Sequence, residues 1–300
     1  MTTFDRRCFD ARPRWLARLG RLALSGLLAV AALAQAAPRL TIVDGEASVL
    51  DGDRALLATE GQTLGAEAIV RTGGRTTLLR IEWPDGTAAD LGPDTEAMVE
   101  PGGFGLRGGR APALYLMRGW VKLSALGSAT TPGLLTPRVD VPPFKGVLVL
   151  MAGAGEQWLF AESGAASLLE RDAKAPAPLA LRTGEVYARE GGAKGTVAPR
   201  PTPAQMQRVP RGFRDSLPLR LAAVKDRSVN PRSTAMPGYA DLHDWLAGER
   251  ALRRHFTKRF AAQAREPAFR AALAEHLGSH PEWEPVLFPE RFTKPASGAR

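Results

Sequence analysis

The stretch RIEWPDGTAADLGPDTEAMV, residues 80–99, decides the fold because it joins short apolar-alternating runs through two tight-turn signals. The Pro-Asp-Gly at 84–86 and the Gly-Pro-Asp at 92–94 are typical of turns, in which the short acids Asp85 and Asp94 bond to local backbone amides. Glu82, Asp90 and Glu96 alternate with apolar residues, which predicts that they share the solvated face of adjacent strands. The stretch therefore indicates a small β-sheet rather than a catalytic cluster, although such carboxylates could still attract a cation.

The same β pattern extends on both sides, from about residue 40 to 190. Short apolar runs alternate with turn signals at Asp51-Gly52-Asp53, at Gly73-Gly74 and around Arg118-Gly119, and no helical period separates them. We expect a mainly β fold of many short strands, solenoid-like or a sandwich. The alternation predicts a core of Ile42, Val49, Leu56, Ile69, Leu78, Leu114, Leu116, Val121, Val147, Val149, Leu159 and Leu168.

A weak internal repeat relates the two halves of this region. VDGEASVLDGDRALLATEGQTL resembles ESGAASLLERDAKAPAPLALRTGEVY, so that Gly45 matches Gly164 and Gly61 matches Gly184. Residues 47–50 match residues 166–169 in the same alignment. The repeat predicts two related β units or repeated rungs.

The amino end is typical of an export signal. Six arginines precede the apolar run LALSGLLAVAALAQAA, and Ala34-Gln35-Ala36 offers a cleavage site, so residues 1–36 are predicted to be a signal peptide. An uncleaved membrane anchor is the alternative, and both place the remainder outside the cytoplasm, in the periplasm. Cys8 is the single cysteine and lies in this segment, so the exported part has no thiol for a disulfide or a thiolate metal site.

Composition divides the rest of the chain into a β domain at 37–190, a Pro-rich linker at 191–236 and a helical region at 237–300. In the last part, apolar and aromatic residues recur at helical spacing, which predicts two or three short helices in an antiparallel packet. The chain carries a net charge of +9, and its carboxyl third is basic while its middle is slightly acidic. An exported basic region favours envelope anions or a partner over nucleic acid.

In their order, the β motifs resemble the FecR-type extracytoplasmic domain family over about residues 40–190. The positions that carry the resemblance are Arg71-Thr72-Gly73, Asp85-Gly86, Arg118-Gly119, Thr136-Pro137 and Gly184-Glu185. The resemblance implies an all-β periplasmic module without catalytic residues. The chain shows no counterpart of the family's membrane helix and cytoplasmic anti-sigma segment, and the residues after 237 lie outside the family pattern.

Few residues suggest chemistry, so we predict no enzyme, no cofactor and no metal site. His276 and His280 are four apart, but Gly278 and Pro281 interrupt the helix that a two-imidazole site requires. Cations interleaved with aromatic residues form a candidate surface for anions, a partner, an anionic membrane or peptidoglycan: Arg250, Arg253, Arg254, Lys258 and Arg259. Three tryptophans are candidates for stacking on sugars: Trp83, Trp120 and Trp158.

These observations predict a non-enzymatic exported envelope protein that acts in protein interaction or signalling. A scaffold that binds peptidoglycan or polysaccharide is the alternative, and exposure of the three tryptophans on one face favours it.

Overall fold

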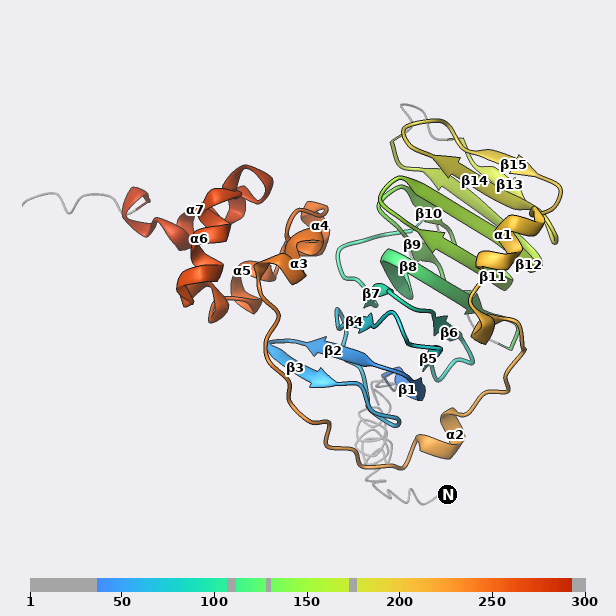
Figure 1. The fold of residues 1–300 in the computed structure, drawn as a ribbon, viewed down its shortest axis with the longest axis horizontal. Coiled ribbons are helices and arrows are strands. Elements are labelled where there is room, and N and C mark those ends of the chain that lie inside the picture. Colours follow the sequence, from blue (N-terminus) through green and yellow to red (C-terminus); the bar gives the residue numbers. More distant parts are fainter. Residues whose placement is uncertain (1–36, 107–111, 128–130, 173–176, 293–300) are drawn as a thin grey trace, which may run out of the picture. The chain divides into compact units, whose positions relative to one another are not determined.

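The computed structural model describes residues 37–106, 112–127, 131–172 and 177–292, and the predicted signal peptide with Cys8 lies outside these ranges. The described chain is mainly β and is followed by short helices (Figure 1), which confirms the predicted fold class. None of the helices in these ranges has the length and apolar content needed to span a membrane.

The strands form two sheets that share the long strands β8 and β12. Sheet A comprises, in order, β1 (Arg39–Asp44), β5 (Leu78–Glu82), β6 (Ala88–Leu91), β8 (Leu114–Ser124), β11 (Lys145–Ala152), β12 (Glu156–Glu170), β14 (Val186–Glu190) and β15 (Thr196–Ala198). Sheet B comprises β3 (Arg54–Leu57), β2 (Ala47–Asp51), β4 (Ile69–Thr72), β7 (Glu96–Val99), β8, β9 (Leu134–Leu135), β10 (Val139–Val141) and β12. A further strand, β13 (Leu179–Leu181), pairs with β12. These pairs are antiparallel except for the parallel pair β8–β9.

Gly119 lets β8 serve both sheets. The first half of β8 pairs with β7, and its second half pairs with β6 and β11. Gly119 has a φ of +93°, and a Cβ there would lie 2.4 Å from the Cα of Thr95. Since only glycine fits this backbone, Arg118-Gly119 is a bend within one strand and not a turn between two.

The inner faces of the two sheets enclose the main core. In β5, Leu79 and Ile81 point into this core while Arg80 and Glu82 point outward, as the period of two requires. Eleven of the twelve predicted core residues are buried, and Ile42 is half-buried. Three of the buried ones, Ile69, Leu78 and Val149, lie on outer faces, where separate clusters form.

The predicted repeat is visible in the backbone. The hairpin β2–β3 corresponds to the pair β12–β13. The matched glycines Gly45, Gly164, Gly61 and Gly184 all have positive φ, at +119°, +75°, +89° and +86°. The Leu40 amide donates to the Gln62 carbonyl, and the Ala161 amide donates to the Glu185 carbonyl. Each acceptor directly follows one of the matched glycines, Gly61 or Gly184. The chain therefore builds two similar rungs.

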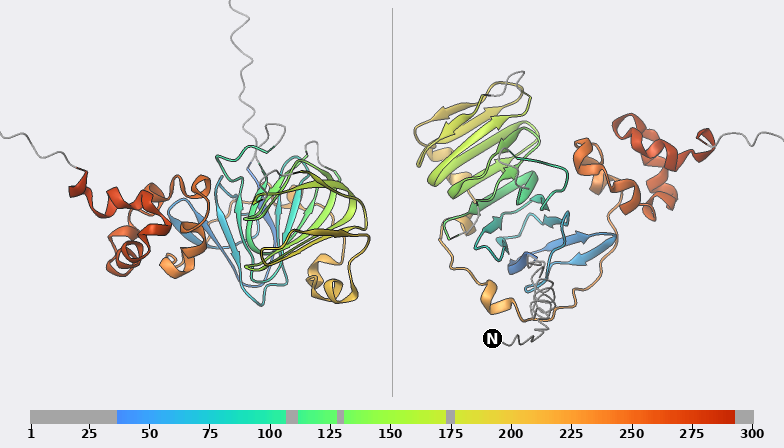
Figure 2. Two further views of the ribbon diagram at one scale, coloured as in Figure 1. Left: turned by 90° about the horizontal axis from the view of Figure 1, so that it is seen from above. Right: turned by 180° about the vertical axis from the view of Figure 1, so that it is seen from behind.

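Residues 199–236, called the strap below, lie against the outer face of sheet A. The strap contains α1 (Pro203–Arg208), η1 (Arg211–Phe213) and α2 (Leu221–Val224). Val209 and Phe213 pack on outward residues of sheet A such as Val149 and Trp158. Farther along, the strap passes β1 and pairs with the edge strand β3 through Ser233 (Figure 2). This pairing covers an edge that could otherwise recruit another strand.

The carboxyl-terminal helical region covers the outer face of sheet B. Its short helices are α3 (Tyr239–Leu246), α4 (Arg250–Arg253), α5 (Phe256–Arg259), η2 (Gln263–Arg265), α6 (Pro267–Glu275), η3 (Leu277–Ser279), η4 (Pro281–Trp283), α7 (Glu284–Leu287) and η5 (Pro289–Arg291). Its aromatic stripe is buried, but Trp245 and its neighbours share one cluster with Ile69, Met98 and Tyr115 of sheet B. The region is thus packed onto the β-sheets as well as onto itself, and the described residues between 37 and 292 belong to one compact unit.

Candidate interaction surfaces

The three acids predicted to lie on a solvated face are buried, so that prediction is wrong. Glu82, Asp90 and Glu96 are 0%, 1% and 3% exposed. The alternation correctly predicts that these three side chains point away from the inner core. The outer faces, however, are covered by the strap and the helical region, which are distant in sequence.

Asp90 forms a buried ion pair with Arg80. The Arg80 Nε and Nη2 atoms donate to the two Asp90 carboxylate oxygens at 2.5 and 2.8 Å. Burial raises the pKa of Asp90, and the hydrogen bonds from Arg80 oppose that rise. Arg80 also donates to the backbone carbonyls of Leu217 and Pro218 at 3.1 and 3.2 Å. The pair therefore fastens the strap to sheet A.

Glu82 fastens the strap one turn farther on. Its carboxylate accepts the Thr41 hydroxyl at 3.0 Å and the Arg220 and Leu221 amides at 2.9 and 2.7 Å. These two amides open α2 and have no partner within that helix. The Glu82 carboxylate therefore binds both sheet A, through Thr41, and the backbone of the strap.

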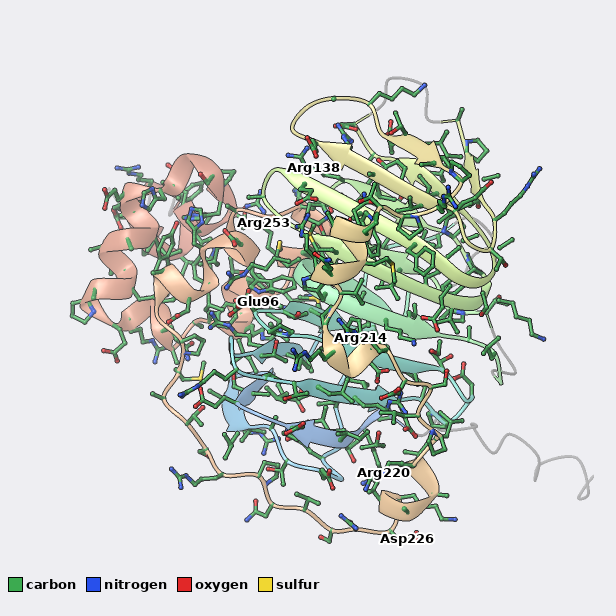
Figure 3. All side chains as sticks on the ribbon, turned by 45° about the vertical axis from the view of Figure 1, so that its right-hand side comes forward. Glu96, Arg138, Arg214, Arg220, Asp226 and Arg253 are labelled. Carbon is green, nitrogen blue, oxygen red and sulfur yellow. The ribbon has the colours of Figure 1, made fainter. Side chains whose placement is uncertain are left out.

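Glu96 joins sheet B to the helical region (Figure 3). Its carboxylate accepts hydrogen bonds from Arg71 Nε at 2.9 Å, from Arg118 Nη2 at 2.8 Å and from the indole N–H of Trp245 at 2.9 Å. A hydrogen bond from Arg118 to this carboxylate raises the pKa of Arg118. A second polar link connects Tyr115 and Arg171 with Glu249.

The two turn acids occupy the predicted places. The Thr87 amide donates to the Asp85 carboxylate at 2.8 Å, and Asp94 adopts a φ of +49° in its turn. Across the described ranges, no three His, Cys, Asp or Glu side chains gather as metal ligands would. The opening stretch thus supplies turns and anchors for the covering segments.

The tryptophans differ in exposure. Trp83 is 8% exposed and donates its indole N–H to Glu100 at 3.0 Å, and Trp158 is 2% exposed. Trp120 is half-buried, with its ring 5.7 Å from that of Trp158. Sugar stacking needs an open ring face, and of these three side chains only Trp120 retains part of one.

The candidate cations also divide. Arg259 donates to the carbonyls of Leu50, Gly52 and Glu67 at 2.6, 2.7 and 2.9 Å, and burial lowers its pKa. Arg253 pairs with Glu282 at 2.5 Å, and Arg254 pairs with Glu67 at 3.2 Å. Arg250 and Lys258 are exposed and make no ion pair with the described residues. Three of the five cations thus hold the helical region in place.

Histidines gather around Tyr239. The His280 ring is fully buried, and its Nε2 lies 3.0 Å from the Tyr239 hydroxyl. His243 and His276, both exposed, pack against the Tyr239 ring. Burial lowers the pKa of His280. These contacts describe a packed helix junction.

Two hollows flank the strap where it crosses sheet A. The first, called the α1 hollow, has a volume of about 460 Å³ and is lined by Val149, Phe160, Glu162, Met206, Gln207, Val209, Phe213 and Arg214. The second, of about 150 Å³, is lined in part by Leu126, Leu217 and Leu219. The buried Lys122 lines the second hollow, donates to the Phe213 carbonyl at 2.7 Å and pairs at 2.9 Å with Glu162, which lines the α1 hollow.

The positive charge of the carboxyl third resides mainly in the strap. Residues 201–236 contain seven basic and two acidic residues, whereas residues 237–300 contain ten basic and eight acidic ones. Sequence reasoning that treated residues 201–300 as one basic region missed this concentration. Counting charge within each predicted segment reveals it.

No family model matches this chain, and no curated protein matches it. Two crystal structures of a proposed anti-sigma factor from Parabacteroides distasonis are similar to it, each with a TM-score of 0.35, at 12% and 13% sequence identity. The alignments cover 44% of this chain and 59% of that chain, so this chain spans less than two thirds of the neighbour. The likeness is distant and concerns the fold alone.

Proposed function

We propose that the protein is a non-enzymatic, exported envelope protein that binds a protein partner through the α1 hollow and acts in signalling. The observation that carries the proposal is the hollow itself. Its walls are apolar side chains from β11, β12 and the strap, including Phe160, Val209 and Phe213. Its one carboxylate, Glu162, is paired with Lys122. A pocket of this kind suits an apolar side chain presented by another protein.

The rim of the hollow supports a protein partner further. Met206 lines it and remains 41% exposed, and its flexible thioether adapts to a partner's surface. Arg214 and Gln207, both exposed, add a polar rim. An apolar centre inside a polar rim is the usual anatomy of a protein interface.

A FecR-like role is supported by where the family's motif positions lie in this chain. Gly86, Gly119 and Gly184 occupy positive-φ turns or bends. The hydroxyl of Thr136 accepts the Val139 amide at 2.9 Å, which forms the Thr-Pro turn before β10. The export signal that the sequence predicts in residues 1–36 supports a periplasmic location for this role.

Pull-down from intact envelope tests the proposal. We expect Met206→Glu to abolish recovery of a specific protein, because the carboxylate places charge at the mouth of an apolar pocket. Ala204→Glu, an exposed change on the same helix outside the lining, serves as the matched control and is expected to retain the partner.

Equal recovery by both variants contradicts the role of the α1 hollow. Retention on purified peptidoglycan that Trp120→Ala removes replaces the proposal with glycan binding.

A further inference from the structure

The strap exposes two leucines at its crossing of sheet A. Leu217 and Leu219 are 38% and 53% exposed, and both line the second hollow together with Leu126, which is 62% exposed. Three exposed leucines around one depression form an apolar patch. Exposed apolar patches on a protein surface mark sites of interaction with a partner or a membrane.

The backbone around these leucines is fixed. Arg80 holds the carbonyls of Leu217 and Pro218, and Glu82 holds the amides of Arg220 and Leu221. Because the polar backbone is fastened inward to buried charges, the leucine side chains remain outside. The strap therefore presents them from a rigid base, which reduces the entropy lost on binding.

The strap carries cations on both sides of Leu217 and Leu219 along the chain, and Figure 3 labels two of them, Arg214 and Arg220. Arg211, Arg214 and Lys225 are exposed and form no ion pair with the described residues. Arg220 and Arg227 share the single carboxylate of Glu60 at 4.0 and 3.8 Å. Asp215 and Asp226 are the only acids between residues 201 and 236, so the surface keeps an excess of positive charge.

We propose that the strap binds the surface of an anionic phospholipid membrane. Leu217, Leu219 and Leu126 enter the boundary between headgroups and acyl chains, and Arg220 and Lys225 contact lipid phosphates. Leucines and arginines on one surface match the two parts of such an interface, since apolar area and charge attraction strengthen binding together. A soluble acidic polymer offers no apolar layer for the leucines.

This inference goes beyond the proposed protein interaction and does not depend on it. The α1 hollow and the hollow beside the leucines have no lining residue in common, although Lys122 of the second pairs with Glu162 of the first. Leu217 and Leu219 line only the second hollow, so substituting them tests membrane binding without altering the lining of the α1 hollow.

Co-sedimentation with vesicles tests the proposal. The chain recovered after export is mixed with vesicles of equal parts phosphatidylcholine and phosphatidylglycerol, or of phosphatidylcholine alone, with residues 1–36 in the same state in every variant. We expect binding to the anionic vesicles, falling at least tenfold in Leu217→Ser/Leu219→Ser. In Arg220→Gln/Lys225→Gln we expect a loss of several-fold and a weaker dependence on salt.

The matched control is Val286→Ser, which removes a similarly exposed apolar side chain, 38% exposed, from α7. We expect it to bind as the unaltered chain does. Equal binding by all variants overturns the proposal, as does equal binding to vesicles of phosphatidylcholine alone. Capture of the chain by polyglutamate in solution, lost with the cations but kept without the leucines, overturns it in favour of an acidic polymer.

Discussion

At the scale of single residues, buried charges organise this molecule. Arg80, Glu82 and Asp90 hold the strap, and Glu96 holds the helical region. Each ionic group has hydrogen-bond partners that offset the cost of burial, as buried charges require. Removing one member of such a buried group therefore lowers the free energy of unfolding by more than the intact interaction contributes, because the other member is left buried without a partner.

Glu96 provides a direct test of that view. Glu96→Ala leaves Arg71 Nε and the Trp245 indole N–H without their acceptor, and we expect the free energy of unfolding to fall by about 3 kcal/mol. Glu96→Gln keeps an acceptor for Trp245 and is expected to cost less. Urea denaturation measures both.

Glu46→Ala is the control, because Glu46 pairs with Arg75 at the surface, where both side chains are largely exposed. We expect a change within about 0.5 kcal/mol. A similar loss for Glu46→Ala and Glu96→Ala contradicts the assigned role of Glu96.

His280 makes stability depend on pH. Its folded-state pKa lies below the unfolded value of 6.5 because burial disfavours the charged ring, so the unfolded chain binds the extra proton first. The contribution of neutral His280 to the free energy of unfolding is fully present above pH 6.5, and it declines as the pH falls from 6.5 toward the folded-state pKa. Tyr239, His276, Arg253 and Glu282 are the titratable or charged groups that act on the ring.

We expect the free energy of unfolding to decrease as the pH falls below about 6.5, and His280→Asn to flatten this part of the profile. Denaturation of both proteins at several pH values measures the difference. An unchanged slope in His280→Asn rules out His280 as its source.

At the scale of elements, the strap depends on a few anchors rather than on its own helices. α1 and α2 are short, with six and four residues, and isolated helices of that length are not stable in water. Lys122 anchors the middle of the strap through the Phe213 carbonyl.

Lys122→Met is expected to loosen this crossing. The substitution removes the bond to Phe213, while Glu162, a third exposed, becomes solvated. We expect trypsin to cleave after Arg211 and Arg214 several-fold faster, because local opening of the strap becomes easier. Lys145→Met, at an exposed site on β11, is the control. Unchanged cleavage in Lys122→Met shows that the strap is held by other contacts.

The sequence reveals the strands and the turns of this fold but not what covers them. Period-two alternation is a local signal, so it predicts the inward residues and places Asp85 and Asp94 in turns. Whether Glu82 or Glu96 meets water depends on Leu221 and Trp245, 139 and 149 residues away. No local pattern reports such contacts. The division among the candidate cations is equally hidden from the local sequence, since Arg259 donates to carbonyls of β2 and of the loops beside it.

At the scale of the whole molecule, the β-sheets, the strap and the helical region share their cores. The helical region supplies Trp245, Phe256 and Phe260 to a cluster that also contains Met98 and Tyr115. Sheet B without this cover would expose an apolar face. We therefore expect the described parts of residues 37–292 to fold as one cooperative unit.

Hydrogen exchange of the full chain at increasing urea, read by mass spectrometry, tests this claim most directly. We predict that peptides from α3 and α6 and peptides from β7 and β8 exchange with the same free energy of opening. Early exchange of α3 and α6, with β7 and β8 still protected, contradicts the claim.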